Sequence, residues 1–70
     1  MELLEVGDMI QRFEFDVPKG SGYKITSVTK TLAKTKDGHY IFFREINEKG
    51  EVNRKNDFFS FNKRYKVIRL

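Results

Sequence analysis

The chain has no cysteine, no tryptophan and a single proline, and no apolar run approaches the roughly 20 residues that a membrane-spanning helix needs. Without cysteine, neither a disulfide framework nor a thiolate metal site is available. Residues 1–5 are acidic and lack the basic and apolar regions of a secretory signal. We therefore expect a cytoplasmic protein that does not enter a membrane.

The length bounds the domain count and the size of the core. Seventy residues predict one domain, residues 1–70. A chain this short buries only about 60% of the surface that its unfolded form exposes. Its core is therefore thin, and we expect a total stability of about 3–5 kcal/mol.

The composition favours β-structure. There are seven phenylalanines, three tyrosines and a single alanine, and apolar residues recur with a period of two rather than 3.6. Short β-like runs alternate with turn signals every 8–12 residues, which is typical of a sandwich or a barrel. Closing the sheet protects its edges. We therefore predict an all-β fold, a small antiparallel barrel of five to six strands.

The predicted elements follow the turn signals. Strands are expected over residues 8–15, 23–29, 32–36, 39–46, 58–61 and 65–70. Residues 16–22, with one proline and two glycines, predict the longest irregular loop. A bulge near Thr26 and Ser27 is expected to bring Ile25 and Val28 to the buried side. Residues 62–64 predict a tight turn before the last strand.

Asp37-Gly38 is the strongest hairpin signal and predicts a two-residue turn. It would place Leu32 opposite Phe43 and Lys30 opposite Glu45. Alternation then predicts an inner face of Thr31, Ala33, Thr35, Tyr40, Phe42 and Arg44. The outer face would carry Lys30, Leu32, Lys34, Lys36, His39, Ile41, Phe43 and Glu45. Exposed apolar groups rimmed by lysine are typical of a contact site, although a bulge or lysine stems would hide Phe43.

A family resemblance covers most of the chain. The segment VGDMI (residues 6–10) opens a strand, a long loop and meandering strands follow, and NKRY (residues 62–65) precedes the last strand. This pattern resembles a Src-homology-3-type barrel. ITSVTKTLA (residues 25–33) and F-x-R-E (residues 42–45) are similar to small phage and bacterial proteins, mostly of unassigned function. The resemblance implies binding of protein or nucleic acid, and the missing tryptophan argues against proline-rich peptides.

No residue pattern indicates catalysis or a cofactor. His39 is the only histidine, and a metal site needs several ligands. No serine lies on a nucleophile elbow, and Gly20 and Gly22 do not form a phosphate-binding loop. Glu14 and Asp16 would share one strand face, where paired carboxylates are usually solvated. We expect a protein that is not an enzyme and holds neither metal nor cofactor.

Two binding functions and one structural role remain as hypotheses. The favoured one is a phage-type module that binds and modulates a host protein. The second is binding of single-stranded DNA or RNA, and the third is a homodimer formed through a strand edge. The candidate binding residues are Lys30, Leu32, Lys34, Lys36, His39, Ile41, Phe43, Lys63, Arg64 and Lys66.

Charge patterning gives a criterion for choosing between the hypotheses. Residues 1–18, 19–36, 37–51 and 52–70 carry net charges of −4, +5, −2 and +5. A nucleic-acid footprint requires the two basic bands to lie together. If pairing interleaves the four bands, that footprint is lost.

Overall fold

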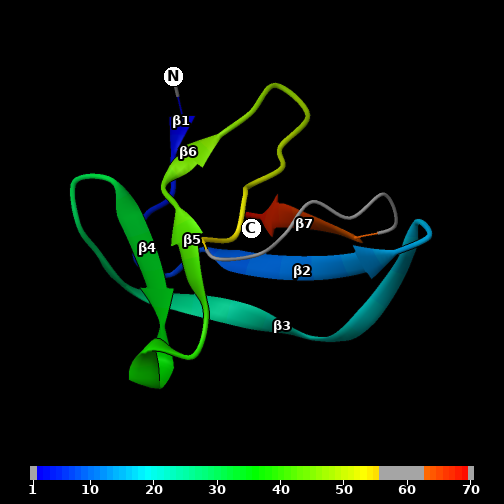
Figure 1. The fold of residues 1–70 in the computed structure, drawn as a ribbon, viewed down its shortest axis with the longest axis horizontal. Coiled ribbons are helices and arrows are strands. Elements are labelled where there is room, and N and C mark those ends of the chain that lie inside the picture. The colour runs from blue at the N-terminus through cyan, green and yellow to red at the C-terminus, as the bar shows by residue number, and fades with distance from the viewer. Residues whose placement is uncertain (1, 56–62, 70) are drawn as a thin grey trace.

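The computed structural model describes residues 2–55 and 63–69, and the regular structure in them is extended apart from one 3-10 turn. Five strands form a curled antiparallel sheet in the order β5-β4-β3-β2-β7, and β1 pairs with β6 in a small second sheet (Figure 1). The strands are β1 (Glu2–Leu3), β2 (Met9–Glu14), β3 (Val17–Val28), β4 (Leu32–Thr35), β5 (Ile41–Phe43), β6 (Glu45–Ile46) and β7 (Lys63–Ile68). The all-β prediction is confirmed. No helix in the described part of the chain is long and apolar enough to span a membrane.

The curled sheet surrounds a thin core. Phe42 is fully buried and meets the ring of Tyr65 edge to face, with 5.4 Å between the ring centroids. Tyr23 and Tyr40 pack against this core from partly buried positions. The buried apolar residues are Leu4, Ile10, Ile25, Ala33, Phe42, Ile46, Val52 and Tyr65.

The loop predicted over residues 16–22 is wrong, because β2 and β3 form a tight hairpin there. Glu14 pairs with Val17, and the two residues between them, Phe15 and Asp16, have φ of 50° and 63°. Positive φ at both central residues is the pattern of a type I′ turn, whose twist matches that of the flanking strands. The strand therefore continues through the proline and both glycines.

The glycines of β3 form a bulge rather than a loop. Arg12 pairs with Lys19 and Ile10 with Tyr23, so residues 20–22 face the single residue Gln11. The Gln11 amide Nε2 donates hydrogen bonds to the carbonyl oxygens of Lys19 (3.0 Å) and Gly20 (3.2 Å). A side chain at Gly22 would also collide with β2, because a Cβ there would lie 3.1 Å from the Ile10 carbonyl oxygen. The bulge therefore requires both a small residue and the glutamine.

Phe15 is an unfavourable residue for its place in the turn. Its side chain is 77% exposed, and a left-handed backbone costs a residue with a Cβ about 1–2 kcal/mol. We expect Phe15→Asn to raise the free energy of unfolding by about 1 kcal/mol, because asparagine tolerates this conformation. Urea denaturation measures the change. Phe15→Leu, which keeps the backbone cost, should give no gain, and a less stable Phe15→Asn would contradict the argument.

The register predicted for the β4–β5 hairpin is confirmed, but its two-residue turn is wrong. Leu32 pairs with Phe43 and Ala33 with Phe42. The turn instead contains the 3-10 turn η1 (Lys36–Gly38) and is closed by a bond from the Thr35 amide to the Tyr40 carbonyl oxygen (3.1 Å). The Thr35 hydroxyl also accepts a bond from the Tyr40 amide (3.1 Å). A buried threonine therefore organises a longer turn.

The strand predicted over residues 39–46 is divided. β5 ends at Phe43, and Glu45 pairs with Leu3 of β1 rather than with Lys30. The bulge predicted near Thr26 is confirmed, because Ile25 pairs with Thr35 and Ser27 with Lys34. Ile25 is fully buried and Val28 packs against the core.

The tight turn predicted over residues 62–64 is wrong for Lys63 and Arg64. Both belong to β7 and pair with Glu14 and Phe13 of β2. The last strand therefore begins two residues earlier than predicted. The strand predicted over residues 58–61, Asn62 and Leu70 lie outside the described residues.

Residues 50–55 close the curled sheet, because their backbone bonds to both of its edge strands. Toward β7, the Val52 amide donates to the Tyr65 carbonyl oxygen and the Val67 amide to that of Gly50, both at 2.9 Å. Toward β5, the Phe43 amide donates to the Asn53 carbonyl oxygen and the Lys55 amide to that of Ile41, both at 2.8 Å. One short segment thus connects the two ends of the sheet.

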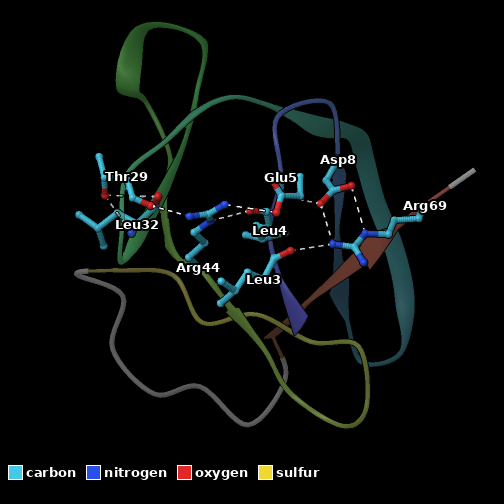
Figure 2. A network of polar contacts seen from close by, with 8 residues as sticks. All are labelled: Leu3, Leu4, Glu5, Asp8, Thr29, Leu32, Arg44 and Arg69. Carbon is cyan, nitrogen blue, oxygen red and sulfur yellow. Dashed lines mark hydrogen bonds and ion pairs between the residues drawn. The ribbon is translucent and has the colours of Figure 1, made fainter. Parts of the chain in front are cut away.

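Two arginines hold the N-terminal segment against the sheets (Figure 2). Arg44 donates to the carbonyl oxygens of Leu4 (2.7 Å) and Thr29 (3.1 Å). Arg69 donates to the Leu3 carbonyl oxygen (2.7 Å) and forms an ion pair with Asp8 (3.1 Å). Burial raises the pKa of Asp8, but hydrogen bonds from Arg69 and the Glu5 amide outweigh it, so the pKa of this carboxyl is lowered.

Candidate binding surface

The outer face of the β4–β5 hairpin is where the sequence places it. Ala33 and Phe42 are fully buried and Thr35 is 8% exposed, so they form the inner side. Phe43, which follows Phe42, points outward and is 45% exposed. Thr31 is an exception, because it was predicted inside and is exposed. We call the predicted outer residues other than Glu45 the lysine face: Lys30, Leu32, Lys34, Lys36, His39, Ile41 and Phe43. Leu32, Lys34, Ile41 and Phe43 lie on β4 and β5, whereas Lys30, Lys36 and His39 lie in the adjoining turns.

The centre of the lysine face consists of two cross-strand pairs. Leu32 lies opposite Phe43, and Lys34 lies opposite Ile41. Directly opposed and diagonal side chains of an antiparallel pair are within reach of each other. The stem of Lys34 therefore lies near Ile41 opposite, Phe43 on the diagonal and Leu32 on its own strand. Leu32, Lys34 and Ile41 are partly buried, whereas the remaining members, Lys30, Lys36 and His39, are exposed. An aromatic ring therefore remains accessible inside a basic rim.

The lysines of this face form no ion pair with any residue that the structure describes. Every ion pair between described residues uses an arginine: Arg12–Glu14, Arg44–Glu5, Arg64–Glu51, Arg69–Glu2 and Arg69–Asp8. Lys30, Lys34 and Lys36 have no ion-pair partner within the described ranges. Their ammonium groups are available to an anionic partner.

The candidate cations Lys63, Arg64 and Lys66 lie on β7 rather than on the hairpin. β7 and β5 are the two edge strands of the sheet, and residues 50–55 lie between them where the sheet closes. The pleat of β7 directs Lys63 to the same side as buried Tyr65, and Arg64 and Lys66 to the other. Arg64 lies 3.8 Å from Glu51, and the Lys66 ammonium lies 5.1 Å from the centre of the Phe13 ring. Arg64 and Lys66 thus have contacts of their own within the chain.

The sheet order also interleaves the charge bands. The acidic N-terminal band contributes β2, which lies between β3 of the first basic band and β7 of the second. The charges of β2, Arg12 and Glu14, cancel, so β2 separates the two basic bands without adding net charge.

A second cluster was missed by the sequence analysis. The rings of Tyr23 and Tyr40 are stacked, with centroids 4.2 Å apart and planes tilted by 31°. The Arg54 guanidinium lies 4.5 Å from the centre of the Tyr40 ring. Burial and the neighbouring Tyr40 hydroxyl raise the pKa of Tyr23, against the opposing effect of Arg12. We call Arg12, Tyr23, Tyr40 and Arg54 the tyrosine–arginine cluster.

The tyrosine–arginine cluster also contains an unsatisfied donor. Nε of Arg12 is buried without a hydrogen-bond acceptor, and its ion-pair partner, Glu14, is 3.7 Å away. The four residues come from β2, β3, the turn after η1 and residues 50–55. Only the richness in tyrosine and arginine signals them in the sequence.

An open hollow of about 650 Å³ lies beside β6 and contains none of the predicted site residues. It is lined by Glu45, Ile46, Asn47, Glu48, Lys49, Glu51 and Asn53. Glu51 is already used, because it accepts a bond from the Asn47 amide (3.3 Å) and pairs with Arg64. Across the described ranges, no three His, Cys, Asp or Glu side chains are grouped so that they could hold a metal ion.

Comparison with protein-family models, with curated proteins and with solved structures finds no match for this chain. The resemblance to Src-homology-3-type barrels and to phage proteins stays a prediction.

Proposed function

We propose that this protein is a non-enzymatic binding module whose lysine face binds an acidic surface of a partner protein in the cytoplasm. The observation that carries the proposal is the 45% exposure of Phe43 beside lysines that have no ion-pair partner among the described residues. The sequence resemblance to phage proteins favours a host protein as that partner.

The two kinds of side chain on the lysine face have separate roles. Burial of Phe43, Leu32 and Ile41 against a partner supplies affinity, because aromatic and aliphatic anchors in a desolvated centre dominate interface energetics. The surrounding lysines direct the encounter and select against basic surfaces. Lys34 serves both roles, since its stem lies among the apolar groups.

The charge distribution supports a protein partner over nucleic acid. Binding of a nucleic acid depends on many phosphate contacts. The lysine face offers three lysines, whereas Arg64 is paired with Glu51 and Lys66 lies over the Phe13 ring. A compact apolar centre with a basic rim suits an acidic protein patch better.

A pull-down from nuclease-treated host lysate tests the proposal. We expect the protein to retain a stoichiometric partner, and Phe43→Ser to reduce its capture at least about tenfold, as the loss of an interface anchor does. Phe15→Asn is the matched control, because it removes an exposed phenylalanine at the far hairpin and should leave capture unchanged. Lys34→Glu should weaken capture most at low salt.

Two outcomes would contradict the proposal. Equal capture by the native protein and Phe43→Ser would show that the lysine face is not the contact. Retention of nucleic acid without nuclease, together with an empty lane after nuclease, would favour the nucleic-acid alternative.

A further inference from the structure

The tyrosine–arginine cluster contains a row of stacked side chains, Arg54, Tyr40 and Tyr23. Arg54 stacks on Tyr40 at 4.5 Å, and Tyr40 stacks on Tyr23 at 4.2 Å. Arg12 lies close enough to Tyr23 to influence its ionisation. Tyr23 and Tyr40 pack against the core, which fixes the row from below.

The two guanidinium groups of the cluster have N–H donors without an acceptor among the described residues. Arg54 has no ion pair or side-chain hydrogen bond within the described ranges, so the N–H groups at the edge of its guanidinium are unpartnered. Arg12 has the buried Nε described above. The Tyr23 hydroxyl shares a hydrogen bond with the Tyr40 hydroxyl, so the pair has one O–H proton left for a ligand. Glu14, the carboxylate that pairs with Arg12, is the only acid contacting the cluster among the described residues.

Such a donor set selects an oxyanion. A planar guanidinium binds carboxylate or phosphate through two parallel N–H bonds, and stacking on an aromatic ring leaves that edge available. Stacking also orders the Arg54 side chain before a ligand arrives, which lowers the entropy lost on binding. Because Glu14 is paired with Arg12, the cluster carries a net charge of about +1, and Arg54 supplies the charge that meets the phosphate.

We propose that the tyrosine–arginine cluster binds the phosphate group of a small phosphate monoester. The edge of Arg54 makes the principal contact, one hydroxyl of the Tyr23–Tyr40 pair donates to a remaining oxygen, and Arg12 adds positive charge. The site does not depend on the protein partner proposed above, because Tyr40 shares the inner side of the hairpin with Phe42 whereas the lysine face is the outer side.

The test is a titration of the full chain followed by amide and tyrosine-ring NMR signals. The probes are adenosine monophosphate, inorganic phosphate and adenosine. We expect saturable shifts at Tyr23, Tyr40 and Arg54 with the first two probes and none with adenosine. Tighter binding of the nucleotide than of inorganic phosphate would assign a nucleoside phosphate as the source, and equal binding would assign the phosphate group alone.

Substitutions at Arg54 distinguish a specific binding site from non-specific electrostatic attraction of the anion. Arg54→Gln should weaken binding of adenosine monophosphate about tenfold or more, as expected for loss of charge-assisted bonds. Arg54→Lys keeps the charge but not the planar fork, and should recover only a small part. Lys49→Gln is the matched control, because it removes one positive charge from an exposed turn and should change nothing. Thermal unfolding of each variant verifies that it folds.

Several results would overturn the inference. These are no saturation with either phosphate probe at millimolar concentration, shifts confined to Lys34 and Phe43, adenosine binding as well as the nucleotide, or full affinity in Arg54→Lys. Tyr40→Phe supplies a check that does not depend on charge, since it keeps the stacked ring and removes one hydroxyl. It should weaken binding less than Arg54→Gln, and a larger effect would contradict the role of Arg54.

Discussion

Phe42→Ala is expected to leave the chain largely unfolded at 25 °C. Phe42 is fully buried, at the point where its ring meets Tyr65. Truncating a buried phenylalanine costs about 3–5 kcal/mol, which equals the whole stability expected for a domain of this size. Circular dichroism and urea denaturation measure the loss.

The neighbouring residue provides the control. Phe43 lies on the same strand and is 45% exposed, so Phe43→Ala should cost about 1 kcal/mol or less and leave the fold intact. A cooperative transition for Phe42→Ala close to that of the native protein would contradict the assignment of the core.

Arg44→Met is expected to lower the free energy of unfolding by about 2–3 kcal/mol, because it leaves three acceptors in two segments without their donor. The Arg44 side chain is 17% exposed and bonds to Leu4, Glu5 and Thr29 (Figure 2). Leu4 itself is fully buried, so water replaces the lost bond poorly. Urea denaturation gives the size of the effect, and faster amide exchange in β1 and β6 gives its location.

Substitution of Arg69 tests whether the burial of the arginine side chain determines the loss of stability. It bonds to the same N-terminal segment, at Leu3 and Asp8, but its side chain is 42% exposed. Arg69→Met should therefore cost clearly less than Arg44→Met, since solvent screens exposed pairs. Equal losses would contradict the argument. Arg44→Lys should recover less than half, because an ammonium cannot reach three acceptors in a plane.

The sequence was sufficient for the β4–β5 hairpin because its signals are local. Alternation and the Asp37-Gly38 dipeptide aligned Leu32 with Phe43 and identified which face is buried. They did not reveal the longer turn, which depends on bonds between Thr35 and Tyr40 that no dipeptide encodes. The lysine face was therefore predictable, although its role in binding stays a prediction.

Other elements depend on contacts between distant residues. Phe15-Asp16 is an unusual pair for a type I′ turn, so the β2–β3 hairpin gave no local signal. Gly20 and Gly22 suit a loop and a bulge equally well, and the bonds from Gln11 decide between them. The tyrosine–arginine cluster was missed for the same reason, because its members come from four separate segments.

The closure by residues 50–55 has a consequence for aggregation. An open edge of a sheet is a template on which another chain can form β-structure. Here one stretch protects the edges at both β5 and β7, so its detachment would expose two templates at once. Local opening of such short segments requires less free energy than global unfolding. Propensity to aggregate should therefore follow the stability of residues 50–55 rather than that of the whole domain.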